Sequence, residues 1–127
     1  MTEPLFICYA RCSTCARARA WLDGHGIAYR ERDIREDNPN ADELAFWHRA
    51  SGLPIRRFFN TSGQLYRAMR LKDRLPGLSD AEAIELLATD GMLVRRPLLV
   101  VPGADGDSPT VLVGFREAQW EQTLVRD

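Results

Sequence analysis

The pattern of apolar positions in the first third of the chain alternates between strand-like and helix-like stretches. Residues 5–9 form a continuous apolar run, which is typical of a strand buried on both faces. Residues 16–23 are mostly good helix formers, and the glycines that follow predict the end of a helix. Residues 27–34 alternate loosely and predict a second strand. Two strands joined by a helix form a βαβ unit, so we expect them to be parallel.

The middle of the chain, residues 35–92, carries helical patterns and no strand signal. Two capping boxes predict helix starts, one formed by Asn40 with Glu43 and the other by Ser79 with Glu82. Between these helices the same pattern predicts further helical pieces. They are expected at residues 53–59 and 65–71.

Strand patterns return in the last third of the chain. Residues 98–101 and 110–115 are apolar, and a loop rich in Gly, Asp, Ser and Pro separates them, which predicts an antiparallel hairpin. Residues 117–124 predict a short amphipathic helix. The expected order is therefore β-α-β, a helical block, and β-β-α.

Composition and charge narrow the class of protein. With 127 residues, 45% of them hydrophobic and 28% charged, the chain suits one globular domain with a modest core. Its net charge of -1 argues against a general nucleic-acid binder. The N-terminus shows no secretory signal, and no apolar run approaches the ~20 residues that span a bilayer. We therefore expect a cytoplasmic protein that contacts neither nucleic acid nor membrane directly.

Three cysteines lie within eight positions, which does not suit the disulfide framework of a small secreted domain. Cys12 and Cys15 form a CxxC at a strand-to-helix turn, which indicates thiol redox chemistry or half of a metal site. A zinc site needs two more ligands, and the only histidines are His25 and His48, so we expect no metal. Cys8, within the first strand, is expected to be an unreactive core residue.

The position of the CxxC after the first strand completes a fold prediction. A redox cysteine pair at this point of the β-α-β … β-β-α order is typical of an α/β protein with a thioredoxin-like fold. We expect residues 1–127 to form a single domain. Its thioredoxin-like core would comprise residues 1–34 and 93–127, and residues 35–92 would form an all-helical insertion.

Several short motifs follow one another in a specific order along the chain. They are Tyr9-x-x-Cys12-x-x-Cys15, Arg32-Asp33-Ile34, Gly52-Leu53-Pro54, Phe58 to Gly63, Asp90 to Pro97 and Val113-Gly114-Phe115. In this order they resemble the glutaredoxin-linked arsenate reductase and Spx superfamily, and most closely its branch of small reductases with a CxxC. The likeness covers nearly the whole chain.

The resemblance implies a site and a source of electrons. It implies that Cys12 is the redox nucleophile and that Cys15 can pair with it. It also implies that Pro97 follows a cis peptide bond and faces the cysteine loop, with Arg96 binding an anion. No cofactor is expected to be bound, and glutathione with glutaredoxin, or thioredoxin, would supply the electrons.

The chain departs from the arsenate-reducing pattern at two arginines and one cysteine. That family surrounds its oxyanion with three arginines, of which Arg96 matches one. The arginine expected in the insertion falls near Asn60, and the one expected after the last strand falls near Phe115 and Arg116. Arsenate reductases of this type also lack the second cysteine and use glutathione instead. Thiol redox chemistry is thus better supported than arsenate as the substrate.

Stabilising a thiolate at this turn needs several contributions. A helix N-terminus supplies only ~0.3–1 kcal/mol, and up to ~2 kcal/mol when it is partly buried. We expect backbone N–H groups of the turn around Ser13 and Thr14 to donate to the sulfur or to a bound anion, and Arg11 or Arg96 to add positive charge. Arg95 is expected to be an ordinary surface charge.

Two functions from different classes remain open, besides loss of activity on a retained fold. In the first, Cys12 attacks an oxyanion or a disulfide and Cys15 or glutathione resolves the intermediate. In the second, the protein is a redox-sensing regulator like Spx, which binds the C-terminal domain of the RNA polymerase α subunit. The polymerase-binding surface of that family includes the insertion, where Gly52 lies here. The Phe58–Gly63 and Asp90–Pro97 motifs favour the reductase.

Overall fold

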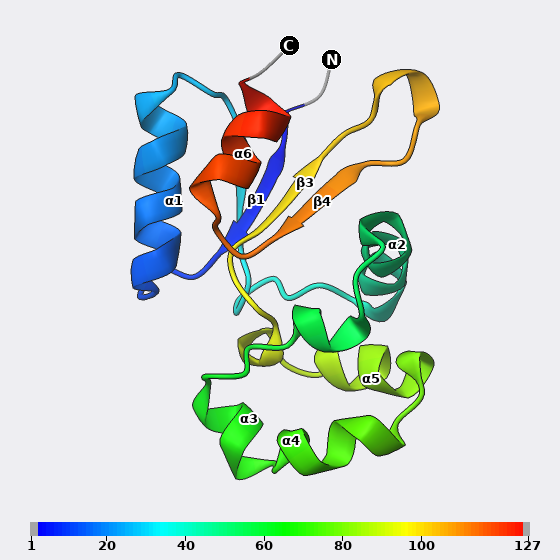
Figure 1. The fold of residues 1–127 in the computed structure, drawn as a ribbon. Coiled ribbons are helices and arrows are strands. Elements are labelled where there is room, and N and C mark those ends of the chain that lie inside the picture. The colour runs from blue at the N-terminus through cyan, green and yellow to red at the C-terminus, as the bar shows by residue number, and fades with distance from the viewer. Residues whose placement is uncertain (1–2, 126–127) are drawn as a thin grey trace.

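A mixed β-sheet forms the centre of the molecule in the computed structural model, which describes residues 3–125 (Figure 1). Strand β1 pairs in parallel with β2 and antiparallel with β3, and β3 pairs antiparallel with β4, giving the spatial order β2-β1-β3-β4. The predicted βαβ unit, hairpin and α/β thioredoxin-like fold are confirmed. The strands are β1 (Leu5–Cys8), β2 (Arg30–Asp33), β3 (Leu98–Val101) and β4 (Thr110–Val113).

Alternate side chains of the strands enter two separate cores on opposite faces of the sheet. Phe6 of β1 and Leu99 of β3 pack beneath helices α1 (Ser13–Gly24) and α6 (Glu117–Leu124), which Figure 1 shows together on one side. Ile7 and Leu98 enter the other core, which the helices of the insertion cover. Because β1 and β3 are buried on both faces, their unbroken apolar sequences are explained.

Residues 35–92 are helical, with single turns of 3-10 helix between the α-helices. Both capping boxes are formed: Asn40 Oδ1 accepts from the N–H of Glu43 at 2.8 Å, and Ser79 Oγ accepts from that of Glu82 at 3.1 Å. Within residues 3–125, no helix is long and apolar enough to cross a membrane. The α-helices of the insertion are α2 (Ala41–Ser51), α3 (Gln64–Ala68), α4 (Leu71–Arg74) and α5 (Asp80–Leu87).

Some predicted boundaries were wrong for identifiable reasons. The helix expected over residues 65–71 is split into α3 and α4 at Arg70, whose φ of 55° lies in the left-handed region. This break brings Leu71 into the core, where it is fully buried. The last strand ends at Val113 because Gly114 has a φ of 79°. Helix α1 begins at Ser13, three residues earlier than expected, which places Cys12 at its N-cap.

The insertion is attached to the core at both of its ends. At its start, Arg32 of β2 binds both carboxylate oxygens of Glu43 at 2.8 and 2.9 Å. At its end, the buried Gly91 lies so close to the carbonyl of Ile34 that there is no room for a Cβ. These two attachments fix the position of the insertion beside the cysteine loop.

Candidate active site

The two cysteines of the CxxC differ in exposure because of their places in the turn. The N–H of Cys12 donates to the carbonyl of Tyr9 at 3.1 Å, which closes the turn between β1 and α1. Cys12 is the N-cap residue and is partly exposed. Cys15 lies in the first turn of α1 and has 0% exposure. A substrate can therefore reach Cys12, whereas Cys15 is positioned behind it as an internal thiol.

The surroundings of Cys15 favour its thiolate. A hydrogen bond from the Cys8 thiol, another from the N–H of Tyr9 at 3.3 Å, and the charge of Arg96 lower the pKa of Cys15, although burial opposes them. The contact with Cys15, burial and the Glu31 carboxylate raise the pKa of Cys8. Of these two neighbouring thiols, Cys15 is therefore the one that ionises first.

Cys8 is buried as expected, but its surroundings are polar. Its sulfur lies 3.3 Å from Glu31 Oε2 and 3.3 Å from Arg19 Nη2, and these two side chains form an ion pair at 2.6 Å. Cys8 thus connects an ion pair on α1 and β2 with the thiol of Cys15. Local sequence patterns did not reveal this arrangement, because Glu31 lies 23 residues after Cys8 along the chain.

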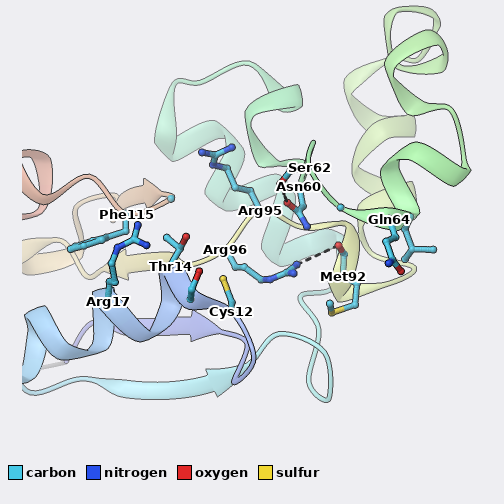
Figure 2. Close-up of a pocket in the computed structure, with 14 residues that line it drawn as sticks. Cys12, Thr14, Arg17, Asn60, Ser62, Gln64, Met92, Arg95, Arg96 and Phe115 are labelled. Carbon is cyan, nitrogen blue, oxygen red and sulfur yellow. Dashed lines mark hydrogen bonds between the residues drawn. The ribbon is translucent and has the colours of Figure 1, made fainter.

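A pocket of about 750 Å³ opens in front of Cys12 (Figure 2). Three arginines line it and no acidic residue does, although the chain as a whole has a net charge of -1. Its walls come from the start of α1, the insertion, the segment before β3 and the end of β4. The lining residues are Cys12, Ser13, Thr14, Arg17, Asn60, Ser62, Gly63, Gln64, Leu65, Met92, Arg95, Arg96, Gly114 and Phe115.

Arg96 is held at the Cys12 end of this pocket. The peptide bond between Arg96 and Pro97 is cis, as the resemblance implied. The guanidinium lies 5.2 Å from the centre of the Tyr9 ring, and Nη1 lies 3.5 Å from the carbonyl oxygen of Met92. Its Nε is buried without a hydrogen-bond partner. Because such a donor is costly to leave unpaired, Arg96 is suited to bind an anion beside Cys12.

The other predicted site residues are not all brought together. Ser13, Thr14 and Asn60 line the pocket with Cys12, whereas Arg11 and Arg116 are exposed and do not line it. The side chain of Cys12 accepts no capping hydrogen bond. The first-turn N–H groups of α1 lack intrahelical partners, so they are available to an anion at the Cys12 end of the pocket.

Two pocket arginines were missed from the sequence. Arg17 follows Ser13 by four residues on α1, so both lie on the same helix face and reach the same pocket. That spacing is a signal that could have identified it. Arg95 is exposed, as a surface charge would be, but it also lines the pocket. Its N–H donates to the carbonyl of Phe58 at 2.8 Å, a contact between distant segments that the sequence does not reveal.

Across residues 3–125, no group of three or more His, Cys, Asp or Glu side chains is placed to hold a metal ion.

Comparison with known proteins decides the family. A model of the ArsC family matches residues 8–123, which include both cysteines of the CxxC and all the pocket residues. This chain belongs to the ArsC family.

Relatives of this ArsC-family protein include both reductase-like and regulatory proteins. The uncharacterized protein YusI of Bacillus subtilis (strain 168) is 44% identical over 92% of this chain and 94% of its own length. A solved structure of "a possible arsenate reductase" from Streptococcus mutans UA159 is 43% identical, covers 97% of this chain and 99% of its own, and has a TM-score of 0.84. The global transcriptional regulator Spx of Enterococcus faecalis is 30% identical over 91% of this chain and 82% of its own length.

Proposed function

We propose that this protein is a cytoplasmic thiol-dependent oxidoreductase in which Cys12 attacks an anionic substrate and Cys15 resolves the intermediate. One observation carries the proposal. Cys12 lies in a pocket that three arginines and no acidic residue line, and the fully buried Cys15 behind it has a lowered pKa. Free thiols suit a reducing compartment, and all three cysteines are free here.

With a disulfide substrate, the reaction is two successive thiol–disulfide exchanges. The Cys12 thiolate attacks one sulfur, forms a mixed disulfide and releases the other half of the substrate as a thiolate. The Cys15 thiolate then attacks the Cys12 sulfur, which forms the Cys12–Cys15 disulfide and releases the second thiolate. An external thiol, such as glutathione with glutaredoxin or thioredoxin, returns two electrons to the enzyme.

The reaction with an oxyanion such as arsenate would proceed through the same two nucleophilic attacks. The Cys12 sulfur would displace one oxygen, which leaves as water, and form a bond to arsenic. Attack of a second thiol on the Cys12 sulfur would leave its electron pair on arsenic, which is thereby reduced from the pentavalent to the trivalent state. Arg96 would neutralise the oxyanion at the Cys12 end of the pocket.

The test is an NADPH-coupled assay of arsenate and of disulfides, with glutathione and glutaredoxin or with thioredoxin and its reductase. We expect Cys12→Ser to abolish turnover. Cys15→Ser should accumulate a Cys12 adduct that intact mass spectrometry detects. Turnover that survives in Cys12→Ser, or a lack of reaction with every substrate, would overturn the proposal.

A Spx-like regulator is the second candidate. It is favoured by the similarity to Spx and by the surface of α2, where Phe46 is 45% exposed and Gly52 is exposed at the C-terminal end of the helix. A pull-down with the C-terminal domain of RNA polymerase α, comparing reduced with diamide-oxidised protein, tests it. Binding that changes with redox state and is lost in Phe46→Ser supports the regulator, and turnover without binding supports the reductase.

A further inference from the structure

The pocket is much larger than an oxyanion requires. A tetrahedral oxyanion has five heavy atoms and displaces only a few water molecules of about 30 Å³ each. The pocket measures about 750 Å³, within the range of sites that enclose organic ligands. An oxyanion beside Cys12 would therefore leave most of the pocket filled with water.

The three arginines are spread along this volume. In Figure 2 the guanidinium of Arg96 points toward Met92, whereas that of Arg17 points the opposite way and lies beside Phe115. Arg17 follows Cys12 by five residues, a rise of about 7.5 Å along the axis of α1. Arg95 also belongs to the Phe115 end, because its Nε would lie 3.0 Å from a Cβ built on Gly114.

The two outer arginines are not engaged by the protein. Among the side chains that the structure describes, neither Arg17 nor Arg95 has an ion-pair partner or a hydrogen bond to another side chain. No carboxylate lines the pocket that could neutralise them. Arginine presents a planar fork of donors that matches a carboxylate. Two such forks at one end of a pocket are therefore suited to a carboxylate-bearing ligand.

We infer that Arg17 and Arg95 form a second anion subsite that binds a carboxylate of a small organic disulfide while its sulfur reacts at Cys12. This inference rests on the proposed function and specifies its substrate class. Phe115, at the same end of the pocket as these arginines, would pack against the organic part of the ligand. The positive φ of Gly114 and its missing side chain leave the space that Arg95 occupies.

The bonds formed are those of the two exchanges above, and the subsite changes only which disulfide is attacked fastest. The Cys12 thiolate breaks the S–S bond of the substrate and forms the mixed disulfide with the half whose carboxylate is held by Arg17 and Arg95. The Cys15 thiolate then releases that half as a thiolate. A low-molecular-weight thiol or a dithiol redox protein reduces the resulting intramolecular disulfide.

The experiment tests whether the rate of the reaction depends on the charge of the disulfide and on the two arginines of the proposed subsite. Fully reduced protein is mixed with oxidised glutathione (anionic), bis(2-hydroxyethyl) disulfide (uncharged) or cystamine (cationic). The second-order rate constant is measured as formation of the Cys12–Cys15 disulfide, by mass shift after alkylation. The variant is Arg17→Gln/Arg95→Gln, and the matched control is Arg35→Gln/Arg49→Gln, which removes the same charge from exposed positions outside the pocket.

We expect the wild-type protein to prefer oxidised glutathione over the uncharged disulfide by tenfold or more. This ratio should fall at least tenfold in Arg17→Gln/Arg95→Gln and should change less than twofold in the control. Arg17→Lys/Arg95→Lys should recover part of it, and far-UV circular dichroism checks that each variant is folded.

Two outcomes overturn the inference and are distinguishable. The second subsite is wrong, while the proposed function stands, if the wild-type protein oxidises readily but shows no preference for the anionic disulfide. The same holds if the preference falls as much in the control variant as in Arg17→Gln/Arg95→Gln. If no disulfide oxidises the wild-type protein through Cys12, the proposed function fails together with the inference.

Discussion

The guanidinium of Arg96 lies 5.2 Å from the centre of the Tyr9 ring, so the residue before the cis-proline is held over the first residue of the cysteine loop. A cation over an aromatic face gains about 0.5–1 kcal/mol at an exposed site. The same ring therefore holds Arg96 next to Cys12, where its Nε is buried without a hydrogen-bond partner.

This contact predicts graded losses of activity. Arg96→Gln should slow attack on an anionic substrate about 10- to 100-fold, because it removes the charge beside Cys12. Tyr9→Leu should slow it only about two- to fivefold, since it removes the stacking and keeps the arginine. Single-turnover kinetics with oxidised glutathione measure both, and Tyr9→Phe, which retains the ring, serves as the control. Equal losses in Tyr9→Leu and Tyr9→Phe would contradict this role of the ring.

The contact between Cys8 and Cys15 predicts a pH effect. Because a hydrogen bond from Cys8 is the main cause of the lowered pKa of Cys15, Cys8→Ala should move that pKa upward, toward the ordinary range of a thiol. Less Cys15 would then be ionised at neutral pH, so resolution of a Cys12 mixed disulfide should be slower there. The difference from wild type should disappear at alkaline pH, where both forms of Cys15 are thiolates.

The measurement is the rate at which a preformed Cys12 mixed disulfide releases its thiol between pH 5 and pH 10. The rate should rise through a lower midpoint in the wild-type protein than in Cys8→Ala. Coincident midpoints would show that Cys8 does not act on Cys15. A uniform slowing at all pH values would instead indicate altered packing.

The Arg32–Glu43 pair predicts a loss of stability that depends on pH. Arg32 is 15% exposed and binds both oxygens of Glu43, so Glu43→Gln should lower the free energy of unfolding by about 2 kcal/mol. Glutamine can replace glutamate in the capping box, so the change isolates the ion pair. Arg32 lowers the pKa of Glu43, so the contribution is complete above the ordinary value of 4.5. It is lost as the pH falls through the lowered value.

Urea unfolding of wild type and Glu43→Gln at pH 7 and at low pH tests whether the stabilising contribution of the ion pair is lost in acid. The two midpoints should differ at pH 7 and approach each other in acid. Glu85→Gln on the exposed side of α5 should have little effect at either pH. A difference that is equal at both pH values would argue against the ion pair as its cause.

Gly91 predicts a large steric effect where the insertion returns to the core. Because a Cβ at this position would overlap the carbonyl of Ile34, Gly91→Ala should destabilise the protein by about 2–3 kcal/mol. Gly77→Ala is the matched control, since nothing lies within 4 Å of a Cβ there and its change should stay within about 0.5 kcal/mol. Thermal unfolding of the two variants measures the contrast, and similar midpoints would refute it.

Local patterns in the sequence were sufficient to predict several elements of the fold. The apolar run before Cys8, the capping box at Asn40 and the hairpin around residues 102–109 each depend on neighbouring residues only, and each is present in the structure. The cis bond before Pro97 came from the family resemblance, because most X–Pro bonds are trans.

The composition of the pocket could not be predicted in the same way. Arg17 belongs to α1 and Arg95 to the segment before β3, and their presence in one pocket depends on the tertiary fold, which no local pattern reports. Arg11 was one of two candidates for adding positive charge at the turn, but its side chain is exposed and does not line the pocket. The contact of Cys8 with Glu31 depends on the parallel pairing of β1 with β2, in which Phe6 is opposite Glu31.

The hydrogen bond from Trp120 Nε1 to the carbonyl of Gly114 at 3.1 Å joins the last helix to the rim of the pocket. Asn60 and Gln64 form another part of that rim and belong to the insertion. A ligand in the pocket would thus contact segments of the thioredoxin-like core and of the insertion at the same time. Binding of a ligand in the pocket should therefore slow amide hydrogen exchange in both α6 and α3. Slower exchange in these helices, away from Cys12, would then be a measure of binding beside Cys12.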